Sequence, residues 1–418
     1  MTRRILLHVG TPKTGTSYLQ DVLFHNRPLL REAGIAYPAD RFDAHFLAAL
    51  DLMQLPWGGL EQEAVGAWDR LAGEAAETTD GTVVISHEIL ARAGRAHVDR
   101  ALRSLGRDEG AEIHVLVSAR DLTRQIPAEW QENVKHRAEL GYRQFLEQIT
   151  DPERRSRIAS WFWGVQELPD ILDRWAADLP PERVHVVTVP PPGSDPGLLW
   201  QRFTEAFGLG GLALDLGNDR SNPSLGVPET ALVRRINRSM NAQLPPPDYR
   251  PLVRELLAHQ TLSQRRGSPR LSLPADLRGW VHEREEQWAA ELDKRGYDVV
   301  GDLADLRGTD PSDTPATPDT ASGTDGAPAV RSWPDPDQPD EAAVAAAAVD
   351  AIGSLLTEAA AARHEVERLR AALAGAEHEL EQAYEHPGHP LRVKTVRVLE
   401  AHRSGRLALR VYRWVRGR

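Results

Sequence analysis

The chain has 418 residues, a net charge of −11 at pH 7 and no cysteine. It is long enough for one large α/β domain with an appendage, and a hydrophobic share of 41% can fill a sizeable core. The negative charge argues against a general nucleic-acid binder, and the lack of cysteine excludes disulfides, thiolate metal sites and a cysteine nucleophile.

Neither a signal peptide nor a membrane span is expected. The first apolar run, residues 5–9, is short and leads straight into a loop. No stretch approaches the roughly 20 apolar residues that a membrane span needs. We therefore expect a cytoplasmic protein.

The first predicted elements are a buried strand over residues 5–9, a loop over 10–15 and a helix over 16–32. A strand that turns through a glycine-containing loop into a helix directs backbone amides and the positive end of the helix dipole at one place, which is an anion site. Lys13 adds a positive charge. Hydroxyl donors surround it: Thr14, Thr16 and Ser17.

The order of residues in this loop bears on which anion it binds. In a Walker A loop the lysine follows the second glycine, whereas here Lys13 precedes Gly15 and Thr16 stands at the lysine position. A nucleoside-triphosphatase is thereby disfavoured. A glycine-rich turn without a ligand is the structural alternative.

The sequence Pro-Lys-Thr-Gly-Thr-Ser at residues 12–17 resembles the 5′-phosphosulfate loop of bacterial-type sulfotransferases, which use 3′-phosphoadenosine 5′-phosphosulfate (PAPS). The resemblance implies a P-loop-type α/β fold, PAPS as the co-substrate and no metal. It also implies a binding role for the loop residues: Pro12, Lys13, Thr14, Gly15, Thr16 and Ser17.

Further strands are predicted at 35–37, 82–86, 112–118 and 183–189, with helical patterns between them. This alternation indicates a parallel sheet flanked by helices. In such a sheet ligands bind just beyond the carboxyl ends of the strands. The residues that follow these strands are therefore candidates for the site.

The acceptor hydroxyl in a sulfuryl transfer must lose its proton, so a general base is required. The resemblance implies a histidine or a glutamate. His87 and Glu88 follow the strand at 82–86, and His45 lies after the short second strand. The pair His87 and Glu88 is preferred, His45 stays open, and helix capping is the structural alternative for the pair.

The resemblance also implies a 3′-phosphate site, formed in the family by an arginine after a strand and a serine eight residues later. Arg120 matches the arginine, but the serine position is occupied by Ala128. Thr123, Arg124 and Gln125 are candidate substitutes. A late basic loop, in which Arg265 and Arg266 precede Gly267, resembles the loop that closes over this phosphate, with a solvated basic loop as its alternative.

Aromatic residues near these segments suggest an acceptor with a sugar ring. Trp130, Trp161 and Trp163 either stack on such an acceptor or pack in the core. The resemblance does not name the acceptor.

Composition divides the chain into four parts. Residues 1–307 form the sulfotransferase-like domain, and residues 308–340, with seven acidic residues against one arginine, form a disordered acidic linker. Residues 341–385 carry apolar residues at alternating spacings of four and three, which predicts a coiled-coil helix or a lone helix that docks on the domain. Residues 386–418 form a basic amphipathic tail, suited to an anionic membrane surface or an acidic partner.

The sequence thus predicts a PAPS-dependent sulfotransferase that acts on a hydroxyl of a carbohydrate or glycolipid. Its expected partners are PAPS, the acceptor, a second copy through the helix at 341–385 and a membrane surface, with no nucleic acid. Two alternatives remain: a P-loop kinase or NTPase, and an inactive sulfotransferase-like scaffold that acts through its helical tail.

Overall fold

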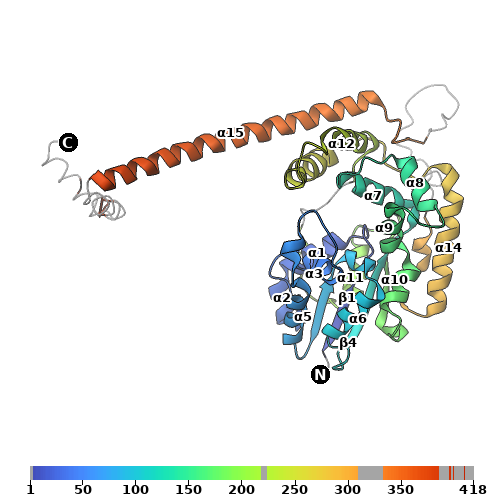
Figure 1. The fold of residues 1–418 in the computed structure, drawn as a ribbon. Coiled ribbons are helices and arrows are strands. Elements are labelled where there is room, and N and C mark those ends of the chain that lie inside the picture. The colour runs from blue at the N-terminus through green and yellow to red at the C-terminus, as the bar shows by residue number, and fades with distance from the viewer. Residues whose placement is uncertain are drawn as a thin grey trace. The chain divides into compact units, whose positions relative to one another are not determined.

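The computed structural model describes residues 3–217, 224–308 and 333–385, together with Thr395, Val396, Leu399 and Leu409. The chain divides into two compact units, Met1–Ala351 and Ile352–Arg418 (Figure 1). Most of the acidic linker and of the basic tail that the sequence predicts lies outside the described residues.

A parallel sheet of six strands forms the centre of the first unit, in the order β2-β3-β1-β4-β5-β6. The strands are β1 (Arg4–His8), β2 (Ile35–Ala36), β3 (Thr82–Ser86), β4 (Glu112–Ala119), β5 (Val184–Thr188) and β6 (Asp298–Val300). In register, Leu6 of β1 lies opposite Val84 of β3 and His114 of β4. The five strands expected from the sequence are confirmed. β6 was not expected, because three residues show no clear pattern.

Helices cover both faces of the sheet, since its strands are apolar on both sides. On one face Leu6 packs in a cluster with residues of α1 (Thr16–His25), α2 (Arg27–Glu32) and α11 (Leu198–Ala206). On the other face Ile5 and Leu7 belong to a larger core. That core includes α3 (Ala44–Met53), α5 (Ala67–Glu77), α6 (Arg95–Ser104) and α7 (Leu122–Lys135). The helix expected over 16–32 is in fact two helices, separated at Asn26 ahead of Pro28.

Further helices extend the larger core. They are α8 (Tyr142–Thr150), α9 (Arg157–Gln166), α10 (Leu168–Trp175), α12 (Val227–Met240), α13 (Pro246–Tyr249) and α14 (Arg278–Arg295). A π-helical segment, η3 (Arg250–Thr261), follows α13. Short pieces complete the unit: α4 (Glu61–Ala64), η1 (Glu88–Arg92), η2 (Pro181–Arg183), η4 (Leu262–Gln264), η5 (Ala275–Leu277) and η6 (Leu303–Leu306).

The last residues of the predicted linker, 333–340, are fixed to the first unit, which differs from the disorder expected there. Trp333 Nε1 donates to the carbonyl of Ser272 at 3.1 Å. The Asp337 carboxylate accepts from the amides of Tyr142 and Arg143 at 3.1 and 2.9 Å. These amides belong to the first turn of α8 and have no partner within that helix. Asp337, which the sequence places in a disordered acidic linker, instead caps α8, a helix far from it in the sequence.

The expected helix at 341–385 is confirmed as α15 (Glu341–Glu385). Its first turns pack on the core of the first unit through Val344, Ala347 and Ala351. Contrary to the expectation of no span, the part Glu341–Gln382 is long and apolar enough to cross a membrane, with a mean hydropathy of 1.4 in its most apolar window. Helices of soluble proteins meet the same two criteria.

Candidate functional site

Three neighbouring strands end at the candidate site. β1 lies between β3 and β4, and the chain fills one side of β1 through β2 and β3 before it crosses to β4 on the other side. A switch of this kind opens a crevice outside the carboxyl ends of the strands. The loop of residues 10–15 follows β1, His87 and Glu88 follow β3, and Arg120 follows β4. The sheet therefore brings the segments predicted to form the site to one edge.

Donors from α7 and from the end of β4 hold the carbonyl groups of the 10–15 loop. The carbonyl of Pro12 accepts a hydrogen bond from the side-chain amide of Gln125. The carbonyl of Lys13 accepts one from Arg120 Nη1 at 3.1 Å. These bonds fix the carbonyl side of the loop against the protein.

The amides that follow have no such partners. Within the described parts of the chain, the backbone amides of residues 13–18 donate to no protein acceptor. Lys13 and Gly15 have φ angles of 63° and 89°, which turn the loop into α1. The φ of 89° favours glycine at position 15, and an added Cβ would also lie 2.7 Å from Leu199 Cδ2, which would have to shift. Unpaired amides at a helix N-terminus are a binding site for an anion.

The hydroxyl groups of the loop differ in their accessibility. Thr14 Oγ1 donates to the Thr11 carbonyl at 2.6 Å and lies 2.5 Å from Ser118 Oγ. This hydroxyl therefore supports the loop from within rather than facing a ligand. Thr16 is buried and Ser17 is exposed.

A buried histidine lies beneath the loop. His8 of β1 contacts Ser86 Oγ through Nδ1 at 2.8 Å and Ser118 Oγ through Nε2 at 3.1 Å. The rings of Phe203 and Phe207 meet it edge-on. Burial lowers the pKa of His8 to about 4, so the ring is neutral at pH 7. It joins β1, β3 and β4 below the loop.

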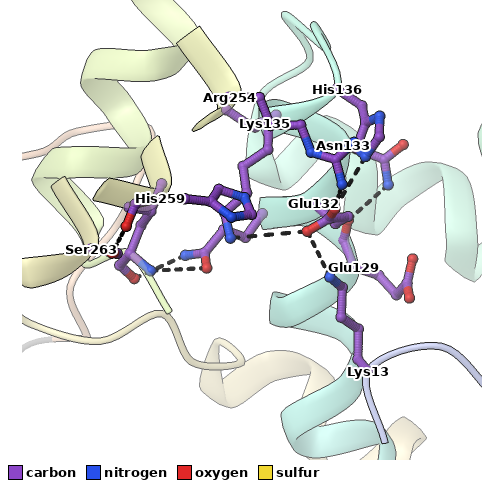
Figure 2. A network of polar contacts seen from close by, with 12 residues as sticks. Lys13, Glu129, Glu132, Asn133, Lys135, His136, Arg254, His259 and Ser263 are labelled. Atoms are coloured by element: carbon purple, nitrogen blue, oxygen red, sulfur yellow. Dashed lines mark hydrogen bonds and ion pairs between the residues drawn. The ribbon is translucent and has the colours of Figure 1, made fainter. Parts of the chain in front are cut away.

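The ammonium group of Lys13 is paired with an acid of α7 (Figure 2). Lys13 Nζ lies 2.6 Å from Glu132 Oε2. The same carboxylate contacts His136 at 3.1 Å, Arg254 of η3 at 3.4 Å and Lys135 at 3.9 Å. Although burial opposes it, Lys13, His136 and Lys135 together hold the pKa of Glu132 well below its usual range. Glu132 is thus an anion that contacts Lys13, Lys135 and Arg254, together with His136, whose pKa burial lowers.

Burial dominates the other basic groups of this cluster. It lowers the pKa of Lys135 to about 8 and that of His259 to about 4. His259 Nε2 is buried without a hydrogen-bond partner among the described residues. Figure 2 shows His259 on the η3 side of the cluster and Lys13 on the loop side.

A second acid of α7 behaves differently. Glu129 is 4% exposed, and its carboxylate accepts a hydrogen bond from Gln166 at 3.1 Å. Burial raises the pKa of Glu129 to about 7, while the charge of Lys13 opposes the increase. A carboxyl group with such a pKa can take up or release a proton near neutrality.

At the end of β3, the two predicted base candidates lie side by side but differ in their bonds. His87 Nδ1 accepts from the Ile89 amide at 3.2 Å, so Nε2 carries the proton of the neutral ring. Glu88 accepts from Gln20 of α1 at 2.9 Å. Although burial opposes it, His87, Gln20 and Lys13 lower the pKa of Glu88. Of the two side chains, Glu88 is the one able to accept a proton at neutral pH.

The third base candidate, His45, is held on both sides by backbone groups. Its Nε2 donates to the Pro38 carbonyl at 2.9 Å, and its Nδ1 accepts from the Ser86 amide at 3.2 Å. Burial lowers its pKa to about 4. These bonds give His45 a structural role at the end of β3.

Aromatic rings connect the β3 and α7 sides of the site. Phe46 stacks on His87 with ring centroids 5.0 Å apart, and Trp57 meets Phe46 at 5.6 Å. Trp57 also meets His136 at 6.0 Å and Trp161 at 5.6 Å. Phe46, Trp57 and Trp161 are half-buried, so part of each ring faces solvent. The other tryptophans considered, Trp130 and Trp163, are buried in the core.

Two arginines follow β4: the guanidinium of Arg124 is fully occupied by protein partners, whereas that of Arg120 is occupied only in part. Arg124 is bound by Asp121 and donates to the Pro190 carbonyl at 3.0 Å. Arg120 bonds the loop through the Lys13 carbonyl, and its buried Nε has no partner in the described structure. Burial lowers the pKa of Arg120 to about 10. A buried guanidinium with an unused donor suits an anionic ligand.

The late basic loop is engaged elsewhere. Arg265 Nε donates to Glu229 of α12 at 2.8 Å, and its other end pairs with Asp350 of α15. Among the described residues, no contact joins Arg265 to the 10–15 loop. Arg266 is exposed. Arg265 thus fixes α15 to α12, which the spacing of the basic residues did not indicate.

The acids of α7 were missed by sequence reasoning, although a signal was present. Gln125, which bonds the loop, is followed by Glu129 and Glu132 on α7 and by His136 directly after this helix, at helical spacings of four, three and four. One helix face therefore presents all of these polar side chains to the loop. Within the residues described, no group of three or more His, Asp or Glu could hold a metal ion.

Comparisons with protein-family models, with curated proteins and with solved structures found no match to this chain.

Proposed function

We propose that the protein is a sulfotransferase that moves a sulfuryl group from PAPS to an acceptor hydroxyl. The observation that carries this proposal is the set of amides of residues 13–18, which have no partner within the described parts of the chain, next to the ammonium of Lys13 at the carboxyl edge of a parallel sheet. This arrangement suits a 5′-phosphosulfate. The resemblance of residues 12–17 to the phosphosulfate loop supplies the choice of this anion over others.

Arg120 is the proposed ligand of the 3′-phosphate. Its buried Nε, which has no partner among the residues that the structure describes, and its bond to the loop support this role. Arg124 is a weaker candidate because Asp121 already binds its guanidinium. Ala128 offers no hydroxyl, so the proposed site relies on Arg120 where the family has two side chains.

In the proposed reaction, the acceptor oxygen forms a bond to sulfur while the bond from sulfur to the 5′-phosphate oxygen breaks. Negative charge builds on that phosphate oxygen, and Lys13 and the loop amides stabilise it. The proton of the acceptor hydroxyl passes to a carboxylate. We assign this base to Glu88, because its lowered pKa keeps the carboxylate ionised and able to accept a proton at neutral pH, and because His87 and His45 use their acceptor nitrogens to bind backbone amides.

The aromatic rings support a carbohydrate or glycolipid as the acceptor. Trp57 and Trp161 expose part of their rings, and Phe46 links Trp57 to His87 beside Glu88. Faces of sugar rings stack on such aromatic surfaces, and the sugar hydroxyls supply the acceptor oxygen.

The kinase alternative requires a carboxylate free to hold Mg²⁺ after a strand. Asp121 follows β4, but it caps α7 through the Arg124 amide at 2.8 Å and pairs with the Arg124 side chain. This makes the kinase the weaker proposal. The inactive scaffold differs from the sulfotransferase in that it would not bind and turn over the nucleotide. The binding experiment therefore distinguishes the two.

The experiment measures the binding of 3′-phosphoadenosine 5′-phosphate by calorimetry. ADP and ATP–Mg²⁺ are measured in the same way as control ligands. We expect selective binding of the 3′-phosphorylated nucleotide without Mg²⁺. Lys13→Ala should weaken it at least tenfold, about 1.4 kcal/mol. Lys294→Ala, which changes an exposed lysine of α14, is the matched control. Preference for ATP–Mg²⁺ would support a kinase, and absence of any nucleotide binding would support the scaffold.

A further inference from the structure

The second unit carries a row of exposed apolar side chains. Ile352, Leu369, Leu373 and Leu380 of α15 are 53–61% exposed, and Leu355 and Val366 are 37% and 45% exposed. In the first unit, by contrast, Val344, Ala347 and Ala351 of the same helix are buried, each at 4% exposure or less. The base of α15 thus packs through a face of its own, and the large apolar side chains beyond it are uncovered.

The stripe follows a heptad repeat without interruption. The first core position, a, is occupied by Ile352, Ala359, Val366, Leu373 and Leu380. The second, d, is occupied by Leu355, Ala362, Leu369, Ala376 and Ala383. A strict seven-residue apolar repeat is the pattern of helices that supercoil around one another. Large apolar side chains that stay exposed along such a repeat indicate an interaction surface.

We propose that this surface binds the same surface of a second copy of the chain, as a parallel coiled coil in register. Charge at the flanking positions selects this arrangement. In a parallel pair, Glu358 (position g) lies beside Arg363 (position e) of the other copy, and Glu365 lies beside Arg370. Both contacts join opposite charges.

An antiparallel pair with full overlap brings like charges together instead. Arg363 then meets Arg370 of the other copy, and Glu358 meets Glu379. Like charges at these positions oppose association. Polarity of the charges along α15 therefore favours the parallel arrangement.

The side chains at the core positions select the number of helices. β-branched residues at a with leucine at d favour two strands over three or four. Ile352 with Leu355, and Val366 with Leu369, follow this rule. Alanines at 359, 362 and 376 bury little apolar area, so the dimer forms in a concentration-dependent equilibrium.

The mass of the full chain in solution tests association. We expect a species of twice 46.3 kDa by sedimentation at high concentration. Leu369→Asp with Leu373→Asp should give the monomer. Ala361→Asp with Ala371→Asp, on the outer face of the helix, is the matched control and should leave the dimer intact. A wild type that stays monomeric at all concentrations would overturn the proposal.

Charge exchange tests the pairing of Glu358 and Glu365 with Arg363 and Arg370. Arg363→Glu with Arg370→Glu should weaken the dimer at least tenfold. Adding Glu358→Arg and Glu365→Arg to the same chain should restore it. Failure of the fourfold variant to recover would contradict the parallel register.

Crosslinking tests orientation directly, because the chain has no cysteine of its own. Leu355→Cys and Ala376→Cys, studied one at a time, should each form a disulfide between copies under oxidation. His364→Cys, on the outer face, should not. Crosslinking at only one of the first two positions would indicate another alignment. A different result would show that a membrane covers the stripe: the wild type stays monomeric but sediments with anionic vesicles, and the variant Leu369→Asp with Leu373→Asp does not sediment with them.

Discussion

Lys13 Nζ and Glu132 Oε2 lie 2.6 Å apart, so a carboxylate of α7 pairs with the ammonium that is proposed to bind the phosphosulfate. The two residues are far apart in the sequence and meet because α7 begins at the end of β4, next to the loop that follows β1. An incoming anion must compete with Glu132 for Lys13.

Glu132→Gln should therefore strengthen binding of 3′-phosphoadenosine 5′-phosphate about two- to fivefold, within the roughly 1 kcal/mol of a partly exposed ion pair. Calorimetry at low and high salt measures the change, which should shrink as salt screens the charge. Glu147→Gln, at an exposed site of α8, is the control. Weaker binding in Glu132→Gln would instead mean that Glu132 positions Lys13 for the ligand.

Glu88→Gln should leave the affinity for the nucleotide within about threefold of wild type but lower sulfuryl transfer about 10²- to 10⁴-fold, the range for loss of a general base. Transfer of label from sulfur-labelled PAPS to a panel of glycans and glycolipids measures the activity. Retention of full transfer activity in this variant would remove Glu88 as the base and direct attention to Glu129.

His45→Ala should act on stability rather than on proton transfer. The variant loses hydrogen bonds to the Pro38 carbonyl and the Ser86 amide, both buried, and should be less stable by about 1–3 kcal/mol. Denaturant unfolding measures the loss. The pH profile of transfer should keep its shape, and a lost limb of that profile would show that His45 is the base after all.

Glu129 should make the protein less stable as pH rises. Burial raises its pKa to about 7 from an ordinary value of 4.5, so between these values the folded state binds more protons than the unfolded state. Stability then falls with increasing pH across this window, by up to about 3 kcal/mol for the full shift. Glu129→Gln, which stays neutral, should remove this part of the pH dependence. The free energy of unfolding of both proteins is measured at pH 5 and at pH 8. If it changes equally with pH in the wild type and in Glu129→Gln, the prediction is wrong.

Asp337→Ala should destabilise the first unit by about 1–3 kcal/mol, because the amides of Tyr142 and Arg143 lose their acceptor and Arg234 loses its carboxylate. Thermal unfolding measures this change. Asp178→Ala, at an exposed site, provides the comparison. No effect at Asp337 would contradict its role as the cap of α8.

The parallel sheet was accessible from sequence because its strands are buried on both faces. Runs such as residues 82–86 are then apolar and β-branched throughout, and the strand ends can be placed within a residue or two. The loop at 10–15 was equally accessible, since glycine, proline and a lysine in one turn have few other uses. Residues His87, Glu88 and Arg120 followed from the rule that ligands bind beyond strand ends.

The partners of these residues were not accessible in the same way. Glu132 and Glu129 lie on a helix whose charged residues look like a solvated face until α9 and η3 cover it. The sequence does not show that Arg265 has ion-pair partners, but in the structure it pairs with Glu229 and Asp350. Long-range pairing of charges depends on how helices pack, and a local pattern carries no information about it.

Sequence by itself therefore determined the order of strands and helices along the chain, the strand–loop–helix unit around residues 10–15 and the heptad repeat of α15, because each depends on the spacing of neighbouring residues. Tertiary structure decided which charges remain available. It paired Lys13 with Glu132 and raised the pKa of Glu129 by burial. It also placed both ring nitrogens of His45 in hydrogen bonds with backbone groups. Burial and contact between distant elements set these properties, and both exist only once the sheet and its helices have assembled.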